Sequence, residues 1–196
     1  MNYDFGFTAV SLQLKETLLV ARALEDNEPL DHALLLGGGK SATGKRKLTE
    51  LKKRLTALPP DERQLLLQGD LRTQRQLAFI AACRVYGFVR DFALEVLREK
   101  LLIFDYQITE GDYLTFLRRK AELHDKLDRL SEVTKKKVRQ VLFLMLEEAG
   151  MIDNTKNKMI QMQFVEPLLA RTVAASGGAW LKVLLLPDID IATLAV

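Results

Sequence analysis

The sequence has little of what catalytic, metal-binding or disulfide-linked proteins usually require. Its 196 residues include one cysteine, Cys83, and two histidines, His32 and His124. One cysteine cannot form a disulfide within a chain, and its apolar surroundings predict a buried, reduced thiol. No His/Cys cluster has the spacing of a zinc site, and no nucleophile–base pair can be argued from spacing. We therefore expect a non-enzymatic protein without a metal ion or cofactor.

Long apolar runs and a strong net charge are also lacking. No uninterrupted apolar stretch approaches the roughly 18 residues that span a bilayer. Residues 1–6 lack the basic and apolar regions of a signal peptide, so we expect a cytoplasmic protein without membrane contact. The net charge is only +3, with 28% charged residues. This net charge is too small to indicate a nucleic-acid partner by itself. Whether the chain binds nucleic acid must therefore be judged from where the charged residues lie.

Helical spacing dominates the chain, and strand signals are few. Apolar side chains recur three and four residues apart in four segments, which are 48–58, 89–101, 113–121 and 138–149. Residues 158–164 alternate weakly between polar and apolar and are the best strand candidate. The pattern predicts a mostly α fold of two small helical subdomains, the second with a helix-turn-helix or winged-helix-like unit and one short β-hairpin. The expected divisions are 1–69, 70–178 and a C-terminal apolar helix and tail, 179–196.

The C-terminal apolar segment has two interpretations. Residues 180–186 and 189–196 are rich in leucine, isoleucine and valine. They could pack on the core of this chain, or they could dock onto a larger partner or a second copy. The pattern leaves both alternatives open.

Residues 39–46 nearly match a P-loop, but the chemistry does not fit. Arg46 occupies the position where a Ser/Thr hydroxyl would bind magnesium, and no alternating β-α series follows to build a sheet. A basic loop feeding a helix capped by Ser41 or Thr43 fits better. Only Glu50 is acidic among residues 40–54, whose basic members are Lys40, Lys45, Arg46, Lys47, Lys52, Lys53 and Arg54. Lys45 and Lys52 share one side of the predicted helix, as do Lys47 and Arg54, and this charge serves either solubility or phosphate binding.

Residues 109–149 have the pattern of a helix-turn-helix. A helix over 109–124, opened by a capping box of Thr109 and Asp112, is followed by a connector, 125–130. The second helix, 131–149, has Ser131 or Thr134 as its cap, and its first two turns contain Lys135, Lys136, Lys137 and Arg139. Lysines are disfavoured at a helix N-terminus, and a phosphate ligand would offset that cost. The alternative is plain solubility, with Glu132 as a local counterion.

In a helix-turn-helix the second helix enters the major groove through its N-terminal residues. We expect Arg139, Gln140 and Phe143 on its exposed side, where Arg139 and Gln140 could read base edges. The lysines before them would hold phosphates. Basic residues in the following turn could touch the neighbouring backbone or minor groove, although the hairpin could equally be a structural flap. The predicted DNA-binding residues are Lys40, Lys45, Arg46, Lys47, Lys53, Lys135, Lys136, Lys137, Arg139, Gln140, Lys156 and Lys158.

Three segments resemble one known family. Residues 55–60 (LTALPP), 83–100 (CRVYGFVRDFALEVLREK) and 130–153 are similar to the BrxA family, small accessory proteins of bacterial BREX phage-exclusion systems. The resemblance covers about residues 8–175. It implies a mostly helical, non-enzymatic protein, likened to the RNA-binding factor NusB, that binds double-stranded DNA and works with other BREX proteins.

Two hypotheses follow. The first is binding of duplex DNA with little sequence preference, with RNA as an alternative ligand. The second is a protein-interaction adaptor or assembly factor of a defence complex, which could form a homo-oligomer.

Overall fold

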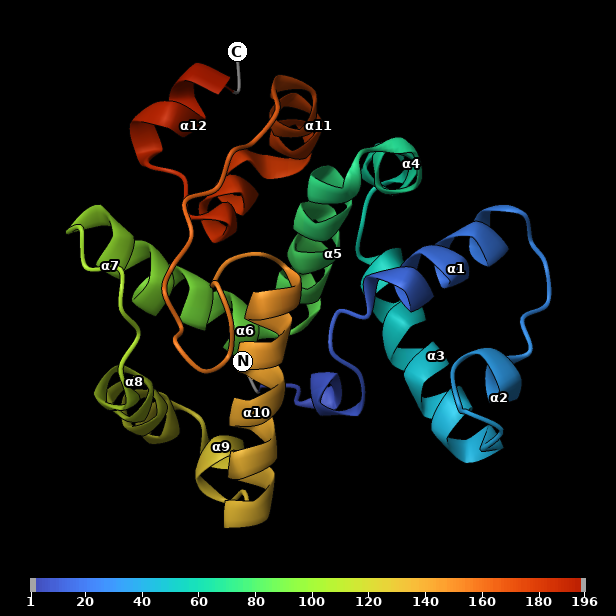
Figure 1. Cartoon of the computed structure of the whole chain (residues 1–196), viewed down its shortest axis with the longest axis horizontal. Coiled ribbons are helices and arrows are strands. Elements are labelled where there is room, and N and C mark those ends of the chain that lie inside the picture. The colour runs from blue at the N-terminus through green and yellow to red at the C-terminus, as the bar shows by residue number, and fades with distance from the viewer. Residues whose placement is uncertain (1–2, 195–196) are drawn as a thin grey trace.

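The computed structural model describes residues 3–194 and is built from helices (Figure 1). In chain order they are η1 (Gly6–Ala9), α1 (Leu14–Glu25), α2 (His32–Leu35), α3 (Ser41–Thr56), α4 (Pro60–Gln68), α5 (Leu71–Val85), α6 (Gly87–Phe92), η2 (Ala93–Arg98), α7 (Glu99–Leu102), α8 (Glu110–Leu123), α9 (Asp125–Asp128), α10 (Glu132–Glu148), α11 (Pro167–Gly177), η3 (Gly178–Leu184) and α12 (Asp188–Leu194). The mostly α prediction is confirmed.

Helix α5 lies at the centre of the hydrophobic core. All of residues 76–83 are buried, as expected for a stretch that is apolar on every side after Gln76, whereas the first turns of α5 expose Arg72 and Arg75. Cys83 is among them as a free, buried thiol, as predicted from the sequence, and burial raises its pKa. Helices α6, η2 and α7 continue as one rod away from the end of α5 (Figure 1), and η2 is a π-helical stretch within it.

A short N-terminal segment, residues 10–13, connects two distant helices. The guanidinium of Arg54 in α3 donates hydrogen bonds to the carbonyls of Val10 and Ser11. The carboxylate of Glu148 in α10 accepts hydrogen bonds from the Ser11 hydroxyl, at 2.8 Å, and from the Leu12 N–H, at 2.7 Å. The same few residues are therefore fastened to α3 on one side and to α10 on the other.

The first part of the C-terminal apolar segment, residues 180–186, packs on the core of this chain, whereas Ile189 in its second part has 75% of its surface exposed. Leu181, Val183 and Leu184 are buried in the core cluster. Nearby, the fully buried Glu62 carboxylate pairs with Arg84 at 2.7 Å, which joins α4 to α5. Residues 195–196 of the predicted tail lie outside the described residues. The predicted boundary after residue 69 falls between α4 and α5, while the division into subdomains stays a prediction.

The predicted β-hairpin does not form. Within residues 3–194 the only β-type pairings are two isolated bridges, Gln107 with Met159 and Ile152 with Ile160. The turn instead uses polar side chains, since the Asp153 carboxylate accepts from the Met159 N–H at 2.8 Å. Lys158 has a φ of 57°, which interrupts any extended run. None of the helices described here combines the length and apolar character that crossing a bilayer requires.

Candidate nucleic-acid interface

The start of α10 presents lysines to solvent, as the sequence predicts. Ser131 is the N-cap and its hydroxyl accepts from the Thr134 N–H at 3.3 Å. Lys135 pairs with Glu132 at 3.0 Å. Lys136 and Lys137 are exposed and form no ion pair with any residue in the range 3–194. Two of the three lysines therefore have their ammonium groups available to an anion.

Helix α10 and the loop that follows it line a shared hollow of about 450 Å³. The lining residues are Lys136, Arg139, Gln140, Phe143, Leu144, Thr155 and Lys158. Lys158 lies over the Phe143 ring, with its ammonium nitrogen 5.5 Å from the ring centroid. The hollow therefore has an apolar floor and a basic rim.

The sequence predicts Phe143 on the exposed side of α10, but the structure buries this side chain. Only 4% of its surface is exposed, because it packs against Phe92 and Tyr113 at centroid distances of 5.8 Å. Gln140 is exposed as predicted. The buried face of α10 is thus one residue position wider than the helical spacing indicated.

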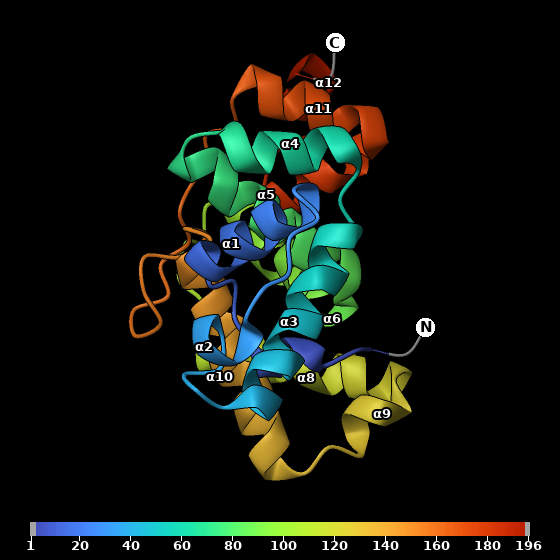
Figure 2. The ribbon, with the colours of Figure 1, turned by 90° about the vertical axis from the view of Figure 1, so that its right-hand side faces the viewer.

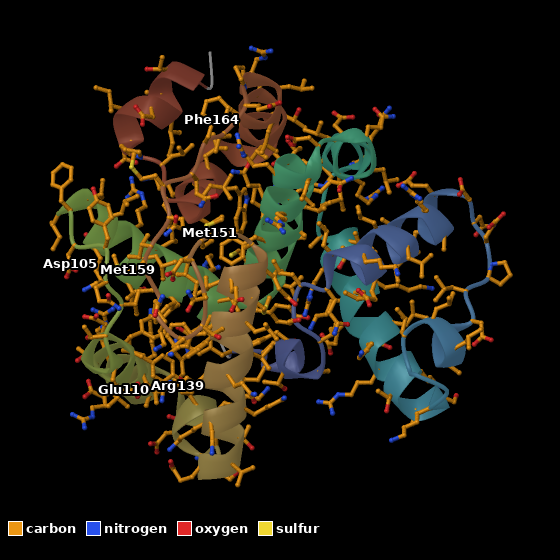
Figure 3. All side chains as sticks on the ribbon, in the orientation of Figure 1. Asp105, Glu110, Arg139, Met151, Met159 and Phe164 are labelled. Carbon is orange, nitrogen blue, oxygen red and sulfur yellow. The ribbon has the colours of Figure 1, made fainter. Side chains whose placement is uncertain are left out.

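Arg139 is engaged by α8. Its guanidinium forms an ion pair with Glu110, the first residue of that helix, and lies 5.5 Å from the Tyr113 ring centroid. Figure 3 shows Arg139 and Glu110 meeting between α10 and α8. The side chain that we expected to read base edges is therefore already bound within the molecule.

The loop over residues 153–159 is ordered by its own side chains. The side-chain amide oxygen of Asn154 accepts from the N–H groups of Lys156, at 2.9 Å, and Asn157, at 2.7 Å. Asp153 is exposed; the slight desolvation of its carboxylate disfavours the charged form, but hydrogen bonds from the Met159 and Asn154 N–H groups outweigh it and lower its pKa. This turn leaves Lys156 exposed next to the hollow.

The second predicted basic group surrounds the start of α3. Lys40 is the N-cap, without a side-chain capping bond, so the predicted caps Ser41 and Thr43 lie within the helix. Lys45 and Arg46 are exposed, while Lys47 is partly buried. None of these cations forms an ion pair within the described part of the chain.

The P-loop-like glycine has a packing role. A Cβ on Gly44 would lie 2.0 Å from the carbonyl oxygen of His32, so only glycine lets α2 approach α3 this closely. The apolar run before the loop forms the short helix α2, not the strand that a P-loop follows. Residues 39–46 thus support helix packing.

Two cations of α3 face other parts of the chain. Lys53 forms an ion pair with Asp4. Arg54, expected to share a basic side with Lys47, is 2% exposed and donates to the Tyr86 hydroxyl at 3.2 Å. The exposed cations of α3 without an ion-pair partner in the described part of the chain therefore lie at its start and at Lys52.

The two basic groups lie in the same half of the molecule but apart from each other. Helices α3 and α10 both begin in the lower half of the two views, with the start of α3 well to the right of α10 in Figure 1 (Figures 1 and 2). Two contributors were not predicted from the sequence: Thr155, which lines the hollow, and Glu110, which neutralises Arg139. No local signal marks Glu110 as a partner, because it is 29 residues from Arg139.

Comparisons with known proteins give a consistent result. The BrxA family model matches residues 1–177. A protein of Escherichia coli O9:H4 (strain HS), named BREX protein BrxA, is 26% identical over 133 residues, covering 68% of this chain and 62% of that protein. A protein of the same name from Bacillus cereus (strain H3081.97) is 24% identical over 118 residues, covering 59% of each. Both matches span less than two thirds of the relative's length.

A solved structure shares the fold. The crystal structure of an uncharacterized protein from Magnetospirillum magneticum superposes with a TM-score of 0.79 at 17% identity, covering 94% of this chain and 98% of that one. At this identity the likeness shows the fold alone.

Proposed function

Because the chain belongs to the BrxA family, we propose that it is a non-enzymatic, nucleic-acid-binding component of a bacterial BREX anti-phage defence system. Its ligand is double-stranded DNA, held through phosphates with little sequence specificity. Other BREX proteins are its partners in that system.

One observation carries this proposal. Lys136, Lys137 and Lys156 are exposed at the start of α10 and in the adjoining loop, and none has a carboxylate partner within residues 3–194. Ammonium groups at such positions bind phosphates and release counterions, which supplies most sequence-independent affinity for DNA. Lys40, Lys45 and Arg46 add a second group at the start of α3, which begins in the same half of the molecule as α10 (Figure 1).

Low specificity follows from the side chains that remain for base reading. Arg139 is held by Glu110, which leaves Gln140 as the exposed side chain suited to a base edge. In this proposal α8, α9 and α10 act as a helix-turn-helix, and the loop over residues 153–159 takes the place of a wing. Phosphate contacts then position the protein, and little sequence is read.

The test is a titration of a nonspecific 24-base-pair duplex at several salt concentrations. The double variant Lys136→Gln/Lys137→Gln should weaken binding to every sequence alike. It should also reduce the slope of log affinity against log salt by about 1.8, since each lost phosphate contact removes about 0.9. The matched control Lys15→Gln/Arg171→Gln removes the same charge from exposed positions elsewhere. Equal behaviour of the two double variants would refute the assigned surface.

Competition separates DNA from RNA. A structured RNA of equal charge should displace the duplex poorly if α10 fits a major groove, because the A-form major groove is too deep and narrow for a helix. Displacement at lower concentrations than unlabelled duplex would favour the RNA-binding alternative.

A further inference from the structure

A second surface lies on the segment between the loop and α11, remote from the basic groups. Two large apolar side chains of this segment face solvent, Met162 with 78% and Phe164 with 61% of its surface exposed. Between and after them, Gln163 is partly buried and Val165 is buried. Side chains that point alternately outward and inward are typical of an extended strand. Figure 3 labels Phe164 near α11, at the opposite end from Arg139.

Side chains of the core fix this segment through hydrogen bonds, while several of its backbone N–H groups remain unpaired. The buried side-chain amide of Gln76 donates to the Phe164 carbonyl at 3.0 Å, and the Gln163 amide donates to the Gly150 carbonyl at 2.8 Å. The N–H groups of Met162, Gln163 and Phe164 make no hydrogen bond within residues 3–194. A fixed strand-like segment with unpaired N–H groups is a template for pairing with another strand.

Hollows of different chemistry lie on either side of the segment. One, of about 460 Å³, is lined by Arg72, Arg75 and Phe164, among others. The other, of about 200 Å³, is lined by Leu102, Phe104 and Leu186, among others. Met162 and Gln163 line both, so the two hollows are neighbours along one edge.

The larger hollow is suited to an acidic group. Arg72 and Arg75 are exposed and one helical turn apart, and neither forms an ion pair within the described chain. The Arg72 guanidinium lies 5.3 Å from the Phe164 ring centroid, which orients it toward the segment. The one carboxylate in this hollow, Asp70, is used as the N-cap of α5, where it accepts from the Thr73 N–H at 2.8 Å.

The smaller hollow is suited to an apolar side chain. Phe104 has 79% of its surface exposed and stands at a φ of 62°, a left-handed conformation that is costly for a bulky residue. Its neighbour Ile103 is 71% exposed. Exposed apolar side chains gathered around a hollow mark interaction sites more often than solvated surface.

We propose that residues 161–165 form a docking edge for an extended peptide of a partner protein. The peptide pairs as an added strand with the unpaired N–H groups on one side of the segment, where every second residue presents its N–H. It places an apolar side chain in the Leu102–Phe104 hollow and an acidic side chain on Arg72 and Arg75. DNA fits this edge poorly, because phosphates leave Met162 and Phe104 exposed and meet Asp190 at the rim of the smaller hollow.

Peptide display tests the proposal on the full chain. A library of random ten-residue peptides is selected for binding, and the enriched peptides should contain an acidic residue close to a large apolar one. Synthetic peptides labelled with fluorescein then give dissociation constants by polarisation. A library that yields no binder, or only basic binders, would overturn the proposal.

Charge reversal locates the acidic contact. Arg72→Glu/Arg75→Glu should weaken the peptide by about tenfold or more, as for a hot-spot contact, and a peptide with lysine in place of its acidic residue should recover. The control Arg118→Glu/Arg129→Glu reverses two exposed charges elsewhere and should leave affinity unchanged. Met162→Ser should weaken the peptide as strongly, while the urea midpoint of the variant stays at that of the parent because this side chain is exposed.

The backbone contact has its own signature. Two peptides are methylated on alternate backbone nitrogens, in opposite phases. An added strand presents only every second N–H to its neighbour, so one phase should abolish binding and the other should not. Equal binding in both phases would overturn strand addition. If Met162→Ser instead abolished self-association in light scattering, or Arg72→Glu/Arg75→Glu abolished duplex binding, the edge would belong to a second copy or to DNA and the proposal would fail.

Discussion

Arg139 of α10 is bound by Glu110 of α8, and the ion pair rests against the Tyr113 ring. The pair is partly exposed, with 38% of the arginine and 49% of the glutamate side chain accessible. An exposed pair of this kind contributes about 0.2–1 kcal/mol to stability. For the proposed DNA binding we expect a larger effect, because the pair holds a cation at the rim of the candidate interface in a neutralised state.

Releasing Arg139 should therefore strengthen DNA binding. Glu110→Gln should tighten binding of a nonspecific duplex several-fold and steepen the salt slope by about 0.9, the value for one added phosphate contact. Fluorescence anisotropy at four salt concentrations measures both. Glu25→Gln is the matched control, since it frees Arg63 from a comparable exposed pair outside the two basic groups. If both variants shift affinity equally, the effect is one of net charge alone.

Two arginines of α3 should separate binding from stability. Arg54→Met removes a buried guanidinium from the Val10 and Ser11 carbonyls. Each buried acceptor left unsatisfied costs about 1–3 kcal/mol, so the free energy of unfolding in urea should fall by about 3 kcal/mol or more. Arg46→Met changes an exposed residue and should alter stability by less than about 0.5 kcal/mol, while weakening duplex binding. The opposite pattern would mean that the two roles are exchanged.

Two glycines should respond to alanine with opposite signs. Gly44→Ala places a methyl group 2.0 Å from the His32 carbonyl oxygen, and overpacking of this kind costs about 1–3 kcal/mol. Gly111 lies in the first turn of α8, where a Cβ would be 3.5 Å from its nearest neighbour, the Thr109 hydroxyl. Gly111→Ala should therefore stabilise by up to about 1 kcal/mol, because alanine loses less backbone entropy in a helix. Thermal unfolding of the two variants measures both changes, and a stable Gly44→Ala protein would contradict the close α2–α3 approach.

Asp112 should contribute stability that depends on pH. Partial burial disfavours its charged form, but hydrogen bonds from the Thr109 N–H and hydroxyl, and the ion pair with Lys100 at 3.1 Å, outweigh this and lower its pKa. The unfolded chain then takes up the proton more readily than the folded one. The contribution is present in full above the unfolded pKa near 3.8 and is lost as pH falls through the lower folded value.

Urea unfolding from pH 7 to pH 2.5 tests this linkage. Asp112→Asn should be less stable than the parent at pH 7, and the difference should shrink below about pH 4. A difference that stays constant across the whole range would show that the capping box does not depend on the charge of Asp112.

Local signals account for the features that the sequence predicted well. The capping box of Thr109 and Asp112 and the Ser131 cap involve residues three positions apart, and such bonds are encoded within one helical turn. The core stripe of α10 follows from helical spacing in the same way. The exposed lysines at the start of α10 lie on the face that this stripe leaves to solvent.

Long-range contacts account for the features that the sequence missed. Arg54 is buried because carbonyls 43 and 44 residues away meet its guanidinium, and nothing near Arg54 distinguishes it from its exposed neighbours. Phe143 is covered by Tyr113 and Lys158, which come from other segments. The hairpin was wrong because Asp153 and Asn154 satisfy the turn's N–H groups with their side chains, so no strand ladder is needed.

The segment over residues 10–13 ties α3 to α10 through Arg54 and Glu148, and this fixes the distance between the two groups of cations. The two basic groups therefore keep a constant spacing. In the proposed mode of binding, a duplex long enough to reach both groups should make both sets of contacts, whereas a shorter duplex should make only one. The affinity for DNA should consequently rise in a single step as the duplex is lengthened. The duplex length at that step then measures the spacing that the segment over residues 10–13 imposes on the two basic groups.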